Sequence, residues 1–221
     1  MASFKFVVNG TSKLLMHADD IERADMLSKF RKDPKNKGIS KAGDDRSPAW
    51  TWQTYLYVDV ETGRVVIPGR CMMACLTKAG THLSGAKRGS LKKSVAAGVL
   101  INEEFLTFTV NGKPIDAKKI LDPATRELDY DGQKALASKL GFELHAIRAK
   151  IGQSKHIRVR PSFSGWSISG TIETLLPEIN SEVLDELFSV AGKRIGIGDW
   201  RPDSPGSPGP HGRFSATVQA M

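Results

Sequence analysis

The segment NSEVLDELFSVAG, residues 180–192, gives the clearest helix signal in the chain, and the elements around it can be placed from there. Asn180 or Ser181 is suited to cap the first turn, and Glu182 favours the positive end of the helix dipole. One apolar stripe runs along the segment, made of Val183, Leu184, Leu187, Phe188 and Ala191. Gly192 follows as a residue that accepts the left-handed conformation of a helix exit. We therefore expect an amphipathic helix that ends at Gly192.

A segment rich in glycine and proline follows this helix, GKRIGIGDWRPDSPGSPGPHGRF at residues 192–214. It precedes a strand-like stretch from Arg213 to Val218, so we predict a structured loop and not a disordered tail. Gly196-Ile197-Gly198 is not followed by a glycine at position 201, and no G-x-x-x-x-G-K-[ST] motif occurs. The loop therefore lacks the glycine patterns that bind nucleotide phosphates.

The rest of the chain alternates strand and helix patterns. Apolar alternation and turn residues predict strands or hairpins at residues 3–10, 51–69, 104–112, 145–160 and 165–175. RCMMACLTKAG, residues 70–80, predicts a helix that Gly80 ends, while residues 129–142 fit a helix or a strand-like connector. This order is typical of an α+β fold in which helices cover one face of an antiparallel sheet.

Composition limits the class of protein. The chain has 221 residues, enough for a hydrophobic core without disulfides or metal, and no apolar run approaches the roughly 18 residues of a membrane span. The first residues lack the apolar core and cleavage site of a secretory signal. Cys71 and Cys75 are its two cysteines, which favours a reducing, cytoplasmic setting. We expect no cofactor and no association with a membrane.

Positive charge is concentrated in three stretches. The formal net charge is +8, which favours a polyanionic partner such as nucleic acid. Residues 23–46 carry eight Lys or Arg against four Asp, with Pro34, Gly38 and Gly43, and predict a flexible basic loop after a short helical segment. Residues 85–93 and 145–160 are basic and contain no acid. A solvated surface normally mixes both signs, so these two clusters indicate a binding surface.

Two motifs far apart in the chain resemble the RAMP superfamily, whose members form the backbone of CRISPR effector complexes. VVIPGRCMMACL, residues 65–76, is similar to the superfamily's IPG followed by a helix, and GKRIGIGDWR with HGRF, residues 192–201 and 211–214, is similar to its C-terminal glycine-rich segment. SKLLMH, residues 12–17, resembles its opening motif. The residues after the IPG motif and the prolines within the glycine-rich segment depart from the usual pattern.

This resemblance implies a ferredoxin-like (RRM-like) fold for a single domain, residues 1–221. It also implies a backbone subunit that oligomerises along single-stranded guide RNA in a CRISPR-type ribonucleoprotein complex, with copies of itself and other effector subunits as partners. By position and charge, the hairpin at 145–160 would be the thumb that inserts between bases, and residues 23–49 the flexible finger. A stand-alone protein that coats single-stranded DNA or RNA, encoded by a phage or mobile element, is the alternative.

The predicted nucleic-acid contacts come from the basic clusters, the start of the helix after Gly69, and the glycine-rich segment. Arginine and lysine neutralise phosphates, and exposed tryptophan stacks on bases. Trp166 is either a stacking residue or part of the core. The predicted binding residues are Arg70, Lys87, Arg88, Lys92, Lys93, Arg148, Lys150, Lys155, Arg158, Arg160, Lys193, Arg194, Trp200, Arg201 and Arg213.

We expect no catalytic and no metal site. Cys71, Cys75 and His82 lack a fourth zinc ligand, and GWSISG at residues 165–170 misses the nucleophile-elbow pattern. Some RAMP proteins cleave RNA with an aspartate in an early loop or with a histidine. An endoribonuclease using His17, Asp19, Asp20 or Asp33 is therefore the second alternative, and no spacing selects one of these residues.

Overall fold

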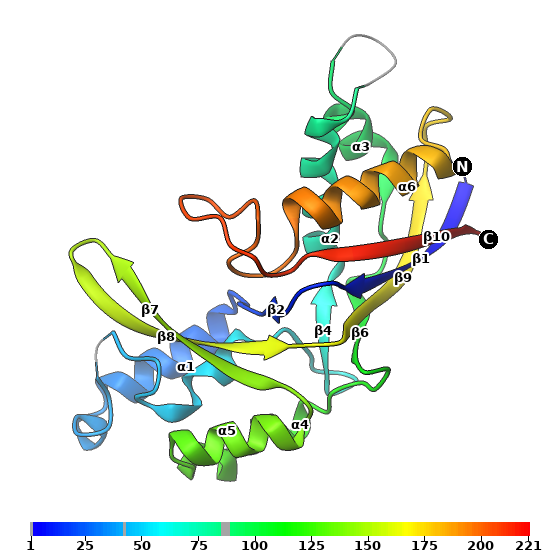
Figure 1. Cartoon of the computed structure of the whole chain (residues 1–221). Coiled ribbons are helices and arrows are strands. Elements are labelled where there is room, and N and C mark those ends of the chain that lie inside the picture. The colour runs from blue at the N-terminus through cyan, green and yellow to red at the C-terminus, as the bar shows by residue number, and fades with distance from the viewer. Residues whose placement is uncertain (1, 42, 85–88) are drawn as a thin grey trace. The chain divides into compact units, whose positions relative to one another are not determined.

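The computed structural model describes residues 2–41, 43–84 and 89–221 (Figure 1). Its strands are mostly antiparallel and are mixed with helices, which confirms the predicted α+β class. Two compact units can be distinguished within the chain. Unit 1 contains Met1–Leu14, Val66–Pro114 and Ser164–Met221, and unit 2 contains Leu15–Val65 and Ile115–Phe163. Unit 2 thus consists of two stretches inserted into the sequence of unit 1, and both predicted insertions, 23–49 and 145–160, fall within it.

Unit 1 is built on an antiparallel sheet in which the first strand of the chain lies between the last strand and β9. The hydrogen-bonded order is β10 (Phe214–Ala220), β1 (Ala2–Gly10), β9 (Trp166–Thr174), β6 (Phe105–Val110) and the end of β4 (Arg64–Pro68). The short strand β5 (Val99–Leu100) pairs with the end of β9. The predicted strands at 3–10, 104–112 and 165–175 are confirmed.

Helices cover one face of this sheet (Figure 1). They are α2 (Gly69–Ala79), α3 (Lys92–Gly98) and α6 (Ser181–Val190), with the 3-10 turn η3 (Gly80–His82) after α2. The Asn180 side chain caps α6 by accepting the N–H of Val183 at 3.0 Å. Phe188 of α6 packs on Phe6 of β1, with ring centroids 5.3 Å apart. The predicted amphipathic helix is therefore confirmed, with its apolar stripe against the sheet.

The end of this helix differs from the sequence prediction. One π-helical turn, η5 (Ala191–Ile195), continues α6, and Gly196, with φ +73°, is the left-handed residue. Gly192 is buried, and a Cβ atom there would collide with the carbonyl oxygen of Phe214. The prediction that Gly192 provides the left-handed exit is wrong because this glycine instead allows the helix end to approach β10.

The glycine-rich segment is held by backbone hydrogen bonds. The N–H of Ile197 donates to the carbonyl of Gly212 at 3.0 Å, and the N–H of Gly212 donates to the carbonyl of Lys13 at 2.8 Å. The N–H of Gly209 donates to the carbonyl of Arg201 at 2.9 Å. The predicted structured loop before the last strand is confirmed.

Unit 2 combines a small sheet with short helices. The sheet order is β2 (Leu14–Leu15), β8 (Ser154–Phe163) and β7 (Glu143–Ile151). The remaining elements are α1 (Ile21–Lys32), η1 (Pro34–Asn36), η2 (Ala49–Tyr55), β3 (Val58–Asp59), α4 (Lys118–Leu121), η4 (Pro123–Glu127) and α5 (Tyr130–Lys139). In the core, the indole N–H of Trp52 donates to the side-chain oxygen of Gln133 at 2.9 Å.

Two segments of unit 2 differ from the sequence prediction. The expected hairpin at 51–69 shrinks to Val58–Asp59 paired with Arg64–Val65, because η2 buries five consecutive residues, 50–54, which a strand with alternating faces does not do. The expected loop 23–49 begins as helix, since α1 extends to Lys32. Asp20 caps α1, and the Arg23 side chain fastens it to η2 through the carbonyls of Gln53 and Leu56 at 3.3 and 3.0 Å.

Among the described residues, no helix combines the length and the apolar character needed to cross a lipid bilayer.

Replacing two glycines of unit 1 by alanine tests how tightly the glycine-rich segment is packed. Gly212 has φ +70° and a Cβ there would collide with the carbonyl oxygen of Ile197, whereas Gly112 has φ +74° and open space around it. Gly112→Ala should lower the free energy of unfolding by about 1–2 kcal/mol through backbone strain alone. Gly212→Ala should cost about 1–3 kcal/mol more because of the collision. Urea unfolding of both variants measures the difference, and equal losses would show that the segment is not tightly packed.

Candidate nucleic-acid interface

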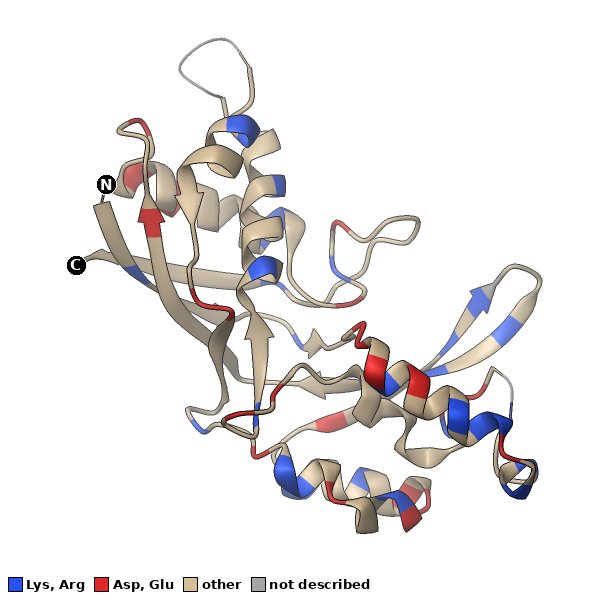
Figure 2. Ribbon diagram, turned by 180° about the vertical axis from the view of Figure 1, so that it is seen from behind, with Lys and Arg blue, Asp and Glu red and all other residues tan. Residues whose placement is uncertain are grey.

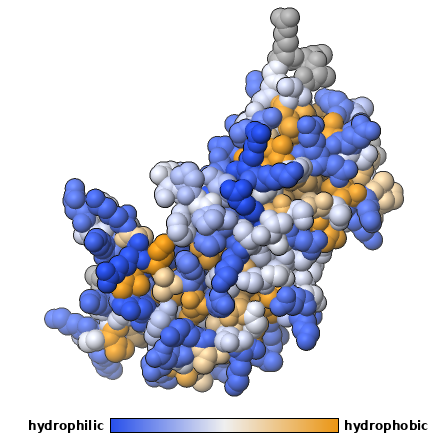
Figure 3. All heavy atoms as spheres, viewed as in Figure 1, coloured by the Kyte–Doolittle hydropathy of each residue, from blue (hydrophilic) through white to orange (hydrophobic). Residues whose placement is uncertain are grey.

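The predicted basic hairpin is present as β7 and β8. Nine residue pairs join the strands, from Glu143 opposite Ser162 to Ile151 opposite Ser154. Gly152 and Gln153 form the turn, and Gly152 has φ +59°, a left-handed conformation that glycine adopts without steric cost. Figure 2 shows Lys and Arg on both strands, and the surface over the outer end of the hairpin is hydrophilic (Figure 3).

The register divides the basic side chains of the hairpin between two faces. Residues directly opposite one another in an antiparallel pair lie on the same face, and alternate residues lie on opposite faces. Lys150 pairs with Lys155, and Arg148, two residues before Lys150, lies on their face. We call these three exposed residues the cationic face. Arg158 and Arg160 lie on the other face.

The cationic face has no neutralising partner among the residues that the structure describes. No carboxylate of these residues lies within ion-pair distance of Arg148, Lys150 or Lys155. Like charges placed directly opposite in an antiparallel pair, as Lys150 and Lys155 are, destabilise it. An anion bound between them would relieve this repulsion.

The opposite face of the hairpin is organised by one buried carboxylate. Asp45 is 1% exposed and accepts from Arg158 at 3.0 Å and from Arg160 at 3.2 Å. It also accepts from the hydroxyl of Tyr55 at 3.1 Å and from the N–H of Val159 at 3.3 Å. Arg158 and Arg160 therefore hold the base of the hairpin together, and sequence alone did not separate them from the cationic face.

Tyr55 completes this cluster. The guanidinium of Arg160 lies over its ring, 4.2 Å from the centroid. Burial of the side chain, and then the nearby charge of Asp45, raises the pKa of the Tyr55 hydroxyl, so it stays a hydrogen-bond donor at neutral pH. Asp45 and Tyr55 were missed by the sequence analysis. The available signal was the pair Asp44-Asp45 inside an otherwise basic stretch.

Unit 1 carries a second group of predicted residues, on the glycine-rich segment. Lys193 and Arg194 are exposed on η5, and Arg213 is exposed before β10. The Arg213 guanidinium donates to the carbonyl of Lys193 at 3.0 Å, and that of Arg201 donates to the carbonyl of Gly198 at 3.0 Å. Lys193 and Arg213 line a hollow of about 540 Å³ that Asp185 and three hydroxyl side chains also line. The lining therefore combines two cations, one carboxylate and three hydroxyl groups.

The two tryptophans considered for base stacking differ in exposure. Trp166 is 1% exposed and its indole N–H donates to the carbonyl of Ser12 at 2.7 Å, so it belongs to the core and not to a stacking surface. Trp200 is half-buried, with φ +47°, and its ring lies against His211 with centroids 5.3 Å apart.

The remaining predicted residues lie elsewhere in unit 1. Arg70 is exposed in the first turn of α2, and Lys92 and Lys93 are exposed in the first turn of α3. Lys87 and Arg88 lie outside the described residues.

The face of the unit 1 sheet that the helices do not cover is rich in hydroxyl groups. Cross-strand rows on this face contain Ser215, Asn9, Ser167 and Thr109, and then Thr217, Val7, Ser169 and Thr107. Phe105, 37% exposed, is the one aromatic side chain that β1, β6, β9 and β10, all of them described, present there. This face can donate hydrogen bonds but offers no row of rings for stacked bases.

The residues considered for catalysis or metal binding do not form one cluster. His17, Asp19 and Asp20 line a hollow beside α1, whereas Asp33 follows α1 and accepts the N–H of Lys35 at 2.9 Å. The Cys75 thiol is buried and donates to the carbonyl of Gly196 at 3.3 Å. In the described part of the chain, no three His, Cys, Asp or Glu residues are placed to hold a metal ion.

No protein-family model matches this chain, and no curated protein matches its sequence. Its function therefore has to be inferred from its own residues.

Asp45 and Asp44 provide a matched test of the buried cluster. Asp45→Ala should lower the free energy of unfolding by about 3–5 kcal/mol, because Arg160 would be left charged and buried without its carboxylate. Asp44→Ala should cost about 1 kcal/mol or less, since its partner Arg46 has a side chain 44% exposed. Thermal or urea unfolding measures both losses, and similar values for the two variants would refute the role given to Asp45.

Cys75 should show the effect of burial on its chemistry. Burial raises the pKa of its thiol from 9.0 to about 12, so the thiol stays protonated at pH 8. We expect iodoacetamide to modify Cys71, which is half-buried, and to leave Cys75 intact in the folded protein, as peptide mass spectrometry can show. Rapid labelling of Cys75 in the folded protein would contradict this prediction.

The raised pKa of Cys75 also predicts a pH dependence of stability. The stability that the protonated thiol contributes is fully present below pH 9, and it is lost as the pH rises toward 12. The free energy of unfolding of Cys75→Ala should lack this part of the pH dependence.

Proposed function

We propose that this protein binds single-stranded nucleic acid along the cationic face of the β7–β8 hairpin. The observation that carries the proposal is the opposition of Lys150 and Lys155 beside Arg148, exposed and without a neutralising carboxylate among the described residues. A phosphate backbone supplies repeating negative charges, and its binding releases condensed counterions whatever the base sequence. The affinity would therefore depend strongly on salt and weakly on sequence.

The side chains on the β7–β8 hairpin suit a nucleic-acid backbone better than those on the open face of the unit 1 sheet. RRM-type recognition stacks bases on aromatic side chains of the open sheet face. That face of unit 1 presents hydroxyl groups and one lysine, Lys5, so it offers little for stacking or for charge neutralisation. The phosphate contacts are assigned to the hairpin, and in unit 1 to Lys193 and Arg213.

We further propose that unit 1 has a ferredoxin-like (RRM-like) core and that the chain is a RAMP-type backbone subunit on guide RNA. The strand order β10-β1-β9-β6 supports this core. If these four strands are numbered along the chain, the order across the sheet is 4-1-3-2, which is the ferredoxin-like order. Helix α2 lies between the first and second of these strands in the chain, and α6 lies between the third and fourth. The IPG motif lies at the junction of β4 and α2, and the glycine-rich segment lies between α6 and β10. Copies of the chain would line up along one RNA strand, with the hairpin as the inserted thumb.

A stand-alone protein that coats single strands is the second candidate. It is favoured by the departures from the family motifs, namely Arg70-Cys71-Met72 after the IPG and the prolines at 202, 205, 208 and 210. The nucleic acid that co-purifies from the expression host separates the two candidates. RNA of uniform length with a repeat-derived end would establish the guide-bound subunit, and heterogeneous RNA or DNA would establish the coating protein.

Neutralising the cationic face should weaken binding and reduce its salt dependence. For the triple variant Arg148→Gln, Lys150→Gln and Lys155→Gln, we expect at least a tenfold loss of affinity for a single-stranded oligonucleotide at low salt. The slope of log K against log salt should become less steep by about 2, since each contact to a single strand contributes about 0.7. Fluorescence anisotropy over a range of salt concentrations measures both quantities.

The control removes three charges elsewhere in the same unit. Lys118, Lys119 and Lys139 are exposed on α4 and α5, and their replacement by Gln changes the net charge by the same amount. If this control loses as much affinity as the hairpin variant, binding follows net charge and the proposed interface is wrong.

A further inference from the structure

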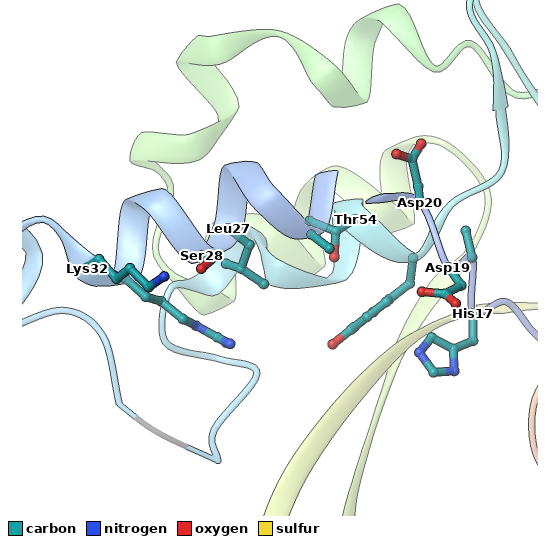
Figure 4. A pocket seen from close by; sticks show the side chains of 11 residues that line it. His17, Asp19, Asp20, Leu27, Ser28, Lys32 and Thr54 are labelled. Carbon is teal, nitrogen blue, oxygen red and sulfur yellow. The ribbon is translucent and has the colours of Figure 1, made fainter. Parts of the chain in front are cut away.

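Unit 2 contains a hollow of about 400 Å³ between α1, the segment before it and the end of η2. Figure 4 shows Lys32 at one end of this hollow and His17 and Asp19 at the other, with Leu27, Ser28 and Thr54 between them. Its volume falls within the range of small-molecule sites. One end of the hollow is positively charged, because Arg31 lines it together with Lys32. The other end carries the carboxylates of Asp19 and Asp20.

Arg31 is the partly buried arginine of unit 2 that lacks a partner among the described residues. Arg23 donates to two carbonyls, Arg158 and Arg160 bind Asp45, and Arg126 lies over the ring of Trp50. The Nε atoms of Arg31 and Arg126 are both buried without a hydrogen-bond partner. Arg126 has the Trp50 ring against its guanidinium, whereas no carboxylate of the described residues pairs with the guanidinium of Arg31. A buried donor on a permanently charged group calls for an acceptor, and a phosphate oxygen is the geometric match for a guanidinium.

Lys32 and Ser28 add to this end of the hollow. Lys32 is exposed and forms no ion pair with a described residue, so a second positive charge is available beside Arg31. Ser28 lies one helical turn before them on the same helix and supplies a hydroxyl donor. Two cations and a hydroxyl are suited to one phosphate group.

The other end of the hollow offers a ring and a carboxylate. The His17 ring is exposed and meets the ring of Tyr55 edge-on, with centroids 4.9 Å apart. The Asp20 carboxylate is engaged by Arg23, through its N–H at 3.2 Å and its Nε at 3.4 Å, whereas Asp19 is exposed at the rim. A ring accepts a stacked base, and a carboxylate accepts hydrogen bonds from ribose hydroxyl or base amino groups.

We propose that this hollow binds a nucleoside monophosphate, with the phosphate at Arg31 and Lys32 and the nucleoside toward His17 and Asp19. The ligand is either a free nucleotide or the 5′-phosphorylated end of a strand, since both present the same phosphate monoester. The site uses none of the glycine patterns excluded above, and it does not depend on the cationic face of the hairpin.

Titration of the full chain with adenosine 5′-monophosphate, adenosine and inorganic phosphate at low salt tests the proposal. We expect the monophosphate to bind at least tenfold more tightly than either adenosine or phosphate. Arg31→Gln should abolish this difference, and Asp19→Asn should bring the affinity for the monophosphate close to that for phosphate alone. The matched control is Lys29→Gln, on an exposed residue of α1 outside the hollow, which should bind like the wild type.

Thermal unfolding of each variant separates loss of the site from loss of the fold. Should Arg31→Gln not fold, Lys32→Gln, at an exposed side chain, provides a second variant that removes a positive charge from the site.

Competition with 5′-phosphorylated and 5′-hydroxyl oligonucleotides identifies the source of the phosphate. Displacement by the phosphorylated strand alone assigns a strand end, and no displacement assigns a free nucleotide. Equal affinities for the monophosphate, adenosine and phosphate would overturn the proposal. So would unchanged binding by the Arg31 and Lys32 variants. The hairpin triple variant should bind the monophosphate normally, so failure of this inference and failure of the proposed function are distinguishable.

Discussion

The buried carboxylate of Asp45 is the interaction on which unit 2 depends. It lies where β8, η2 and the segment at residues 43–45 meet, and it receives hydrogen bonds from two arginines, a tyrosine hydroxyl and a backbone N–H. Beside it, the N–H of Ile157 donates to the carbonyl of Gly43 at 2.8 Å. A carboxylate with an exposed fraction of 1% is stable only when such donors compensate its lost hydration. The same arrangement fixes Arg158 and Arg160 on one face of the hairpin, while Arg148, Lys150 and Lys155 on the other face stay exposed.

The position of each charge matters more than the net charge of +8. Arginines in similar stretches of sequence have different environments: Arg23 binds carbonyls and burial lowers its pKa, while Arg160 is shared between Asp45 and the Tyr55 ring. These side chains stabilise the fold and are not available to a ligand. Among the described residues of unit 2, Arg148, Lys150 and Lys155 on the cationic face, and Arg31 and Lys32 at one end of the hollow, have no carboxylate partner. Both places fit phosphate, and they differ in shape, since one is an exposed ribbon and the other a hollow.

In unit 1, close steric contacts of glycines fix the structure, as the hydrogen bonds of Asp45 do in unit 2. Gly192 and Gly212 lie so close to carbonyl oxygens that any side chain would collide with them. The thiol of Cys75, on α2, donates to the carbonyl of Gly196, so the helix and the glycine-rich segment are tied together. The glycines therefore give this segment one conformation against β1 and β10. Lys193 and Arg213 are held at the edge of the sheet as a result.

The sequence by itself determined the α+β class, the amphipathic helix that starts near Asn180, the β7–β8 hairpin and the structured glycine-rich segment, because periodicity, capping and turn residues act over a few neighbouring positions. The tertiary structure decided the rest. It showed that residues 50–54 form a buried 3-10 turn, that Gly192 serves close packing, and that Arg158 and Arg160 pair with Asp45, more than 100 positions away along the chain. Sequence spacing cannot reveal which cations are neutralised or which chemical groups share a hollow, since burial and ion pairing arise between segments distant in the chain.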